Sequence, residues 1–166
     1  LLTTKGVPRL LGTAQQLAQH DVRLALFGGT PDDVARVGAV AANVSCTPFL
    51  PPADMFNAVA QRASLGVVAL EENFCNRHLT CPVKALDFLA LGMPVVASDL
   101  PSTREVLGNA GIFFPAGDTA RMVAEISRLL DDPDLYRKHA RLARERGADL
   151  SWPKRARRIL DWVGAT

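Results

Sequence analysis

The sequence lacks the features that would point to a membrane span or to nucleic acid. Its longest apolar runs, such as residues 65–70, are far shorter than the ~20 residues that a membrane-spanning helix needs. Aromatic residues make up 6% of the chain and the formal net charge is only +2. Proteins that bind nucleic acid usually combine stacking aromatic rings with a strongly basic surface. We therefore expect neither an integral membrane protein nor a nucleic-acid partner.

The amino terminus also lacks an initiator Met and any basic segment that leads into a long apolar stretch. A secretory signal peptide contains such a basic segment and apolar stretch, so none is expected here. We interpret the 166 residues as a fragment of a longer protein.

Cysteine is scarce, because only Cys46, Cys75 and Cys81 occur in the chain. An odd number disfavours a disulfide framework and favours free thiols in a reducing compartment, so we expect a cytoplasmic location. The spacing Cys75-x2-His78-x2-Cys81 raises the question of zinc. A structural zinc site needs four ligands, and the fourth would have to come from elsewhere, so we predict no metal.

What the sequence does contain is the composition of one soluble globular domain, which we assign to residues 1–166, with 48% hydrophobic and 22% charged residues. Apolar segments predict strands at residues 22–27, 44–46, 65–70, 94–98 and 112–114. Helical periodicity predicts helices at residues 7–19, 31–42, 52–63, 82–91, 101–107, 121–130, 133–146 and 151–163. Strands that alternate with helices predict an α/β fold with a doubly wound parallel sheet, followed by extra C-terminal helices.

Ligands of such sheets bind beyond the carboxyl ends of the strands. Residues 28–30, 46–50, 71–80 and 98–103 follow predicted strands and should share one rim, with residues 71–80 as a loop. The Gly28-Gly29 turn before a helix could bring backbone amides close to a phosphate, or could simply need positive φ angles. It matches neither a dinucleotide-binding fingerprint nor a P-loop.

Lys84 and Asp87 are the charged pair of most interest, because they lie three residues apart near the start of the helix at 82–91. This spacing places them on one helix face. A cation beside the first-turn amides suits phosphate, and a carboxylate one turn further suits sugar hydroxyls. The alternative is an exposed ion pair without a ligand, and spacing alone leaves both open. Thr80 is expected to cap this helix.

The run from Pro82 to Val106, PVKALDFLALGMPVVASDLPSTREV, resembles the signature of retaining GT-B glycosyltransferases of family 4, in their C-terminal nucleotide-sugar-binding domain. Further matching pieces stand in family order: Lys5-Gly6-Val7, residues 26–29, residues 111–118 and Ser151-Trp152. The resemblance implies a Rossmann-like GT-B domain. It also implies transfer of a hexosyl or other glycosyl group from a UDP-, GDP- or ADP-sugar, with retention and with no metal or other cofactor.

The resemblance assigns roles to individual residues. Lys5 matches the family's diphosphate lysine, and Gly28 and Gly29 would admit the nucleotide closely. Residues 47–50, with Phe49, would border the base. Val83 and Lys84 would offer first-turn amides to the phosphates, and Asp87 would hold the ribose hydroxyls.

Two departures from the family pattern concern the acidic positions. Asp87 replaces the usual Glu, which shortens its reach by one methylene. Leu79 stands where the family has its other acidic residue, and the loop residues Glu71, Glu72 or Asn73 could substitute for it. The family's diphosphate arginine, about six residues before Lys5, has no counterpart in this sequence.

The family's acceptor site belongs to an N-terminal domain that we do not find in residues 1–166. We therefore assign no catalytic residue here, and expect the isolated chain to bind nucleotide but not to turn over. The rival interpretation is a non-catalytic nucleotide-sensing or partner-docking domain of the same fold. The basic C-terminal helices are expected to be solvated, or to face the missing domain or a membrane surface in the full-length protein.

Overall fold

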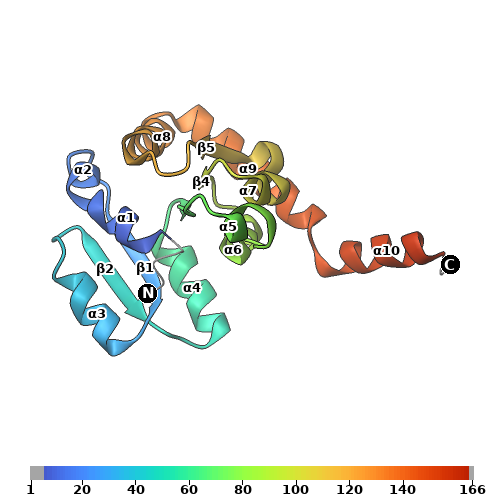
Figure 1. Ribbon diagram of the computed structural model, residues 1–166, viewed down its shortest axis with the longest axis horizontal. Coiled ribbons are helices and arrows are strands. Elements are labelled where there is room, and N and C mark those ends of the chain that lie inside the picture. Colours follow the sequence, from blue (N-terminus) through green and yellow to red (C-terminus); the bar gives the residue numbers. More distant parts are fainter. Residues whose placement is uncertain (1–5, 165–166) are drawn as a thin grey trace.

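The computed structural model describes residues 6–164, in which strands and helices alternate up to Phe114 and helices follow to the end (Figure 1). The strands are β1 (Leu24–Gly29), β2 (Val44–Pro48), β3 (Gly66–Val68), β4 (Val95–Ser98) and β5 (Gly111–Phe114). The helices are α1 (Val7–Gly12), α2 (Ala14–Ala18), α3 (Pro31–Gly38), α4 (Pro52–Arg62), α5 (Phe74–His78), α6 (Val83–Ala90), α7 (Pro101–Leu107), α8 (Thr119–Asp131), α9 (Pro133–Asp149) and α10 (Trp152–Val163). A short 3-10 helix, η2 (Gly108–Ala110), precedes β5.

All strand pairs are parallel, which confirms the predicted α/β class, but the strands form two sheets rather than one. β1 pairs with β2, and β4 lies between β3 and β5. The register of the first pair runs from Leu24 beside Val44 to Phe27 beside Thr47, and then shifts at Gly28. Within residues 6–164, no strand joins β1 to β3, so the five strands that the sequence predicted lie in two parallel sheets.

The core is densest around β4, whose four residues are all buried. Alternate side chains of a strand point to opposite faces, so β4 contributes to two apolar clusters. Val96 packs on one side with residues of α1, α2 and α8, whereas Val95 and Ala97 pack on the other with α6 and α7. Helices on both faces explain why this segment has an unbroken apolar sequence.

Several predicted boundaries differ from the structure. The helix predicted at 7–19 is interrupted at Thr13, whose hydroxyl donates to the Leu10 carbonyl at 2.7 Å. The loop predicted at 71–80 contains α5, because the Asn73 side chain accepts from the Asn76 N–H and caps a helical turn. The helix predicted to end before Gly147 continues through that residue to Asp149.

The last helix, α10, extends away from the rest of the chain (Figure 1) and contributes no buried residue. Lys154, Arg157 and Arg158 lie on its exposed surface, in agreement with the expected solvated basic face. None of the helices within residues 6–164 is long and apolar enough to cross a membrane.

Candidate functional site

A cavity of about 940 Å³ lies between the two sheets. Its lining includes β1, residues of α4 and one face of α6. Four residues that the sequence singled out share this lining: Gly28, Phe49, Lys84 and Asp87. Gly28 lies near the carboxyl end of β1, Phe49 directly follows β2, and Lys84 and Asp87 belong to α6, which comes after β3. Ligands of parallel α/β folds bind beyond the carboxyl ends of the strands. The cavity also extends along β1 to residues 21–23 at its amino end.

Gly28 and Phe49 form the β1 side of the site. Gly28 has φ of 91° at the register shift, a backbone conformation that L side chains rarely adopt. A Cβ at this position would lie 3.2 Å from the Phe49 ring. The Phe49 N–H donates to the Gly29 carbonyl at 3.1 Å, while its ring remains 71% exposed. Gly28 thus lets an exposed aromatic ring lie directly on the end of β1.

Gly29 faces a different neighbour, because a Cβ there would lie 2.9 Å from the Cys46 sulfur. Gly29 is not among the residues that line the cavity. Its lack of a side chain therefore serves close packing between β1 and β2.

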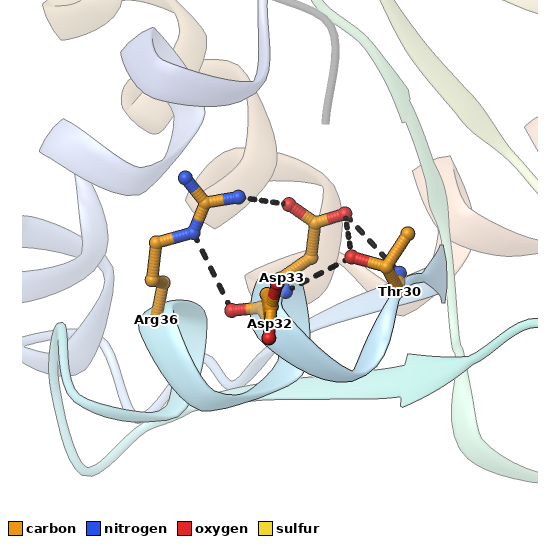
Figure 2. Close-up of polar contacts among 4 residues, drawn as sticks. All are labelled: Thr30, Asp32, Asp33 and Arg36. Atoms are coloured by element: carbon orange, nitrogen blue, oxygen red, sulfur yellow. Dashed lines mark hydrogen bonds and ion pairs between the residues drawn. The ribbon is translucent and has the colours of Figure 1, made fainter.

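The amino end of α3 is closed by its own side chains (Figure 2). The Thr30 hydroxyl donates to Asp33 at 2.8 Å and accepts from the Asp33 N–H at 3.2 Å, and the Thr30 N–H donates to Asp33 at 3.1 Å. Arg36 donates to the second Asp33 oxygen at 2.6 Å. The bonds from the Thr30 hydroxyl and N–H hold the pKa of Asp33 well below its usual range. The carboxylate already occupies the place where an anion would meet α3.

The amino end of α6 carries the second half of the site, with Lys84 exposed and Asp87 half-buried. Burial raises the pKa of Asp87 above its ordinary value. The Val83 N–H donates to the Cys81 carbonyl at 2.9 Å, so a phosphate would have to replace that bond. The prediction that Thr80 caps this helix is wrong: the cap position is Pro82, and the Thr80 hydroxyl lies 3.6 Å from the Cys75 sulfur.

A second cavity, of about 210 Å³, adjoins α6 and the end of β3. It is lined by residues 67–70 and 80–84, so Val83 opens onto it rather than onto the larger cavity. Lys84 lines both cavities. The lysine therefore stands where the two cavities adjoin.

The loop residues proposed to replace the acid at Leu79 all have partners of their own. Glu71 lies 3.5 Å from the Arg9 guanidinium, Arg77 donates to Glu72 at 2.5 Å, and Asn73 caps α5. Leu79 is 71% exposed and lines neither cavity.

Lys5 lies outside the described residues, so its predicted role in binding the diphosphate stays a prediction. Its neighbour Gly6 has φ of 72°, and a Cβ on it would lie 1.6 Å from the Ala69 carbonyl oxygen. This close approach brings the start of α1 to the carboxyl end of β3. Arg9, which the sequence reading did not single out, fixes the same corner by donating to the Gly117 carbonyl at 2.9 Å.

Two buried hydroxyls to which the resemblance assigned no role also support the rim. Ser98 donates to the Leu70 carbonyl at 2.8 Å, and Ser102 donates to the Asn76 carbonyl at 2.5 Å. Their pairing across more than twenty residues is not visible in the sequence.

The cysteines of the considered zinc motif, Cys75 and Cys81, are free and exposed. The His78 ring lies 5.1 Å from the Phe74 ring. Within residues 6–164, no group of three or more His, Cys, Asp or Glu side chains is arranged to hold a metal ion.

Comparison with known proteins adds a family and a fold. Residues 1–132 match the family model described as glycosyl transferases group 1. Sucrose-phosphate synthase from Thermosynechococcus elongatus superposes with a TM-score of 0.69 at 20% identity, over 99% of this chain and 44% of that one. The crystal structure of TarM superposes with a TM-score of 0.73 at 16% identity, over 99% of this chain and 33% of that one. No curated protein sequence matches the chain.

The chain therefore spans less than half the length of these two solved structures, and its likeness to them establishes the fold: a GT-B, Rossmann-like α/β arrangement. The family model covers most of the sequence, including both strands of the first sheet and the Lys84 helix. On this ground the chain belongs to the glycosyl transferases group 1 family.

Proposed function

We propose that this chain is the donor-binding half of a nucleotide-sugar glycosyltransferase and that its ligand is a nucleoside diphosphate sugar. One observation carries the proposal: Gly28, Phe49, Lys84 and Asp87, from separate segments, line one cavity, which runs along β1 and includes its carboxyl end. Membership of a glycosyltransferase family supports the same substrate class.

Each residue has a role that suits its position. The Lys84 ammonium would bind the diphosphate, and the half-buried Asp87 would accept bonds from the ribose hydroxyls. The exposed Phe49 ring would lie beside the base. Gly28 would allow the backbone to approach the nucleotide, with Gly29 contributing only by its close packing on β2, and Val83 would exchange its bond with Cys81 for one to a phosphate. Lys5 is proposed as a second cation for the diphosphate.

We propose that transfer proceeds with retention and without a metal. Negative charge that grows on the departing diphosphate would be balanced by Lys84 and by the amino end of α6. We assign the acceptor site to protein outside residues 1–166, and no catalytic residue to the chain itself. Hexosyl donors are the group that we propose to test first.

Titration calorimetry with UDP, GDP and ADP on the 166-residue chain tests this proposal. We expect micromolar binding of one of the three, and Lys84→Ala should weaken it by ~1–3 kcal/mol, because a charged hydrogen bond is lost. Lys138→Ala is the matched control, since Lys138 is an exposed lysine of α9 that lines neither cavity. Its affinity should equal that of the parent chain.

Failure of all three nucleotides to bind would overturn the proposal in favour of the partner-docking alternative. Equal affinity of the Lys84→Ala and parent chains would remove the lysine from the site. Sugar transfer by the isolated chain would show that the acceptor site lies within residues 1–166.

A further inference from the structure

Lys84 lies between two cavities, and this position divides the proposed ligand into two parts. The lysine lines both the cavity of about 940 Å³ and the second cavity, of about 210 Å³. A nucleoside diphosphate sugar carries its nucleoside and its sugar at opposite ends of the diphosphate. With the diphosphate at Lys84, the nucleoside and the sugar therefore extend into different cavities. This division rests on the proposed function, which places the diphosphate at that residue.

Size and lining assign each part of the ligand to one cavity. The larger cavity contains the Phe49 ring, which suits a base, and the Asp87 carboxylate, which suits ribose hydroxyls. The second cavity has less than a quarter of that volume. Pockets that enclose a complete drug-sized ligand measure roughly 300–1,000 Å³, so the second cavity suits a single ring. The sugar is the part of the ligand that remains for it.

The second cavity is apolar on its buried side. Residues 68–70, which are Val, Ala and Leu, line it and are buried. Pro82 is also buried, whereas Val83 and Lys84 are exposed. The lysine thus lies on the open side of the cavity. A diphosphate bound to it would direct the sugar inward, toward the apolar residues.

Few hydrogen-bonding side chains line the second cavity. Among residues 6–164, no Asp, Glu, Asn or Gln side chain borders it. Thr80 contributes a hydroxyl, which lies 3.6 Å from the Cys75 sulfur. A sugar hydroxyl on the buried side would leave water without a carboxylate or amide side chain to replace its hydrogen bonds, which is unfavourable. A methyl group at the same place would gain free energy by leaving water.

A 6-deoxyhexose matches this lining better than an ordinary hexose does. In a sugar joined to the diphosphate through C1, the exocyclic C6 group protrudes from the ring at a distance from the phosphate. An ordinary hexose carries a hydroxymethyl group there, whereas a 6-deoxyhexose carries a methyl group. The methyl group needs no hydrogen-bond partner, so it suits the buried residues 68–70.

We propose that the second cavity selects a donor whose sugar is a 6-deoxyhexose, with the C6 methyl group against Val68 and Leu70. These two side chains pack in the same apolar cluster, between β4 and the helices α6 and α7. They are the specificity-determining residues for the transferred group, and they narrow the proposed hexosyl donors to one chemical class.

Titration calorimetry of the 166-residue chain tests the proposal with donors that differ in one oxygen atom. The pairs are UDP-glucose with UDP-6-deoxyglucose, GDP-mannose with GDP-6-deoxymannose, and ADP-glucose with ADP-6-deoxyglucose, and the references are UDP, GDP and ADP. For the base that binds, we expect the 6-deoxy donor to bind at least about tenfold more tightly than its 6-hydroxyl partner, because the partner buries an unpaired hydroxyl.

Val68→Thr tests whether the second cavity is the source of this preference. The substitution keeps the branched shape of the side chain and adds a hydroxyl on the buried side. The 6-hydroxyl donor then gains a hydrogen-bond partner, so the two affinities should become nearly equal. Circular dichroism checks that the variant is folded; if it is not, the donor pairs on the parent chain decide alone. Val40→Thr is the matched control and should keep the full preference, since Val40 is 45% exposed and lines neither cavity.

Equal affinity of the two donors of a pair, or tighter binding of the 6-hydroxyl donor, would overturn the proposal. An unchanged preference in a folded Val68→Thr chain would also overturn it, because the second cavity would then not be the source. In either case, binding of UDP, GDP or ADP would leave the proposed function intact. Failure of all three diphosphates to bind would overturn the proposed function and this inference together.

Discussion

Asp87 is a carboxylate whose surroundings favour its neutral form. Burial raises its pKa above the ordinary value of 3.8, because a buried carboxylate loses hydration. The ionised form is therefore better solvated in the unfolded chain than in the folded one. Folding stability declines as the pH rises from about 4 through the raised pKa. A residue retained at this cost is typical of a binding site.

We predict that Asp87→Asn stabilises the chain at pH 7 and weakens nucleotide binding. The amide removes the cost of burying a charge, so the free energy of unfolding should exceed that of the parent chain at pH 7. The difference should vanish below about pH 4, where Asp87 is protonated in both states. Urea denaturation followed by circular dichroism across this pH range measures it.

Asp161→Asn is the control, because Asp161 lies on the exposed surface of α10. Its substitution should leave the stability unchanged at both pH values. A loss of stability in Asp87→Asn at pH 7 would show that the carboxylate makes a stabilising contact in the free protein.

At the residue scale, the sequence predicted which side chains share a helix face better than it predicted their hydrogen-bond partners. The three-residue interval between Lys84 and Asp87 implied a shared helix face, and both side chains line one cavity. Their binding roles remain predictions. The predicted cap at Thr80 was wrong because the cap position is Pro82, two residues later. The closed amino end of α3 follows from Thr30-x2-Asp33, a capping-box pattern that can be read directly from the sequence.

At the scale of elements, Gly147 shows how packing overrides local propensity. Glycine usually marks the end of a helix, so the sequence predicted a break there. The structure runs α9 through it because a Cβ at Gly147 would lie 2.6 Å from the Leu89 carbonyl oxygen of α6. The glycine allows the backbones of two helices to approach closely, a contact between residues almost sixty positions apart that no local pattern reports.

We predict that Gly147→Ala destabilises the chain by ~1–3 kcal/mol, the usual cost of overpacking, because α6 and α9 must separate. Urea denaturation followed by circular dichroism measures the change. Gly38→Ala provides the comparison, since Gly38 ends α3 and a Cβ there meets nothing within 4 Å. That variant should be neutral or gain up to ~1 kcal/mol. Equal behaviour of the two variants would contradict the close-approach explanation.

At the scale of the whole molecule, the two sheets differ in burial. All residues of β4 are buried, whereas four of the six residues of β1 are only partly buried. Alternation of strands and helices was enough to predict the α/β class and five parallel strands. It could not predict the division into two sheets, because strand neighbours depend on contacts between distant segments.

We predict that the two sheets open with different free energies. The Leu26 amide, on the β2-facing side of β1, should exchange at least about tenfold faster than the Val96 amide of β4, because local opening is easier where fewer apolar contacts are broken. Native-state hydrogen exchange by NMR measures both rates. Identical rates would show that the sheets unfold as one cooperative unit.

The exposed α10 helix also determines what the intrinsic tryptophan fluorescence of this protein reports. The chain contains two tryptophans, Trp152 and Trp162, and both lie on α10 with 80% and 87% of their surface exposed. Their emission reports the solvent around one protruding helix. Melting of either sheet, or entry of a ligand between them, would leave that signal almost unchanged, so an optical probe of the interior has to be introduced by substitution.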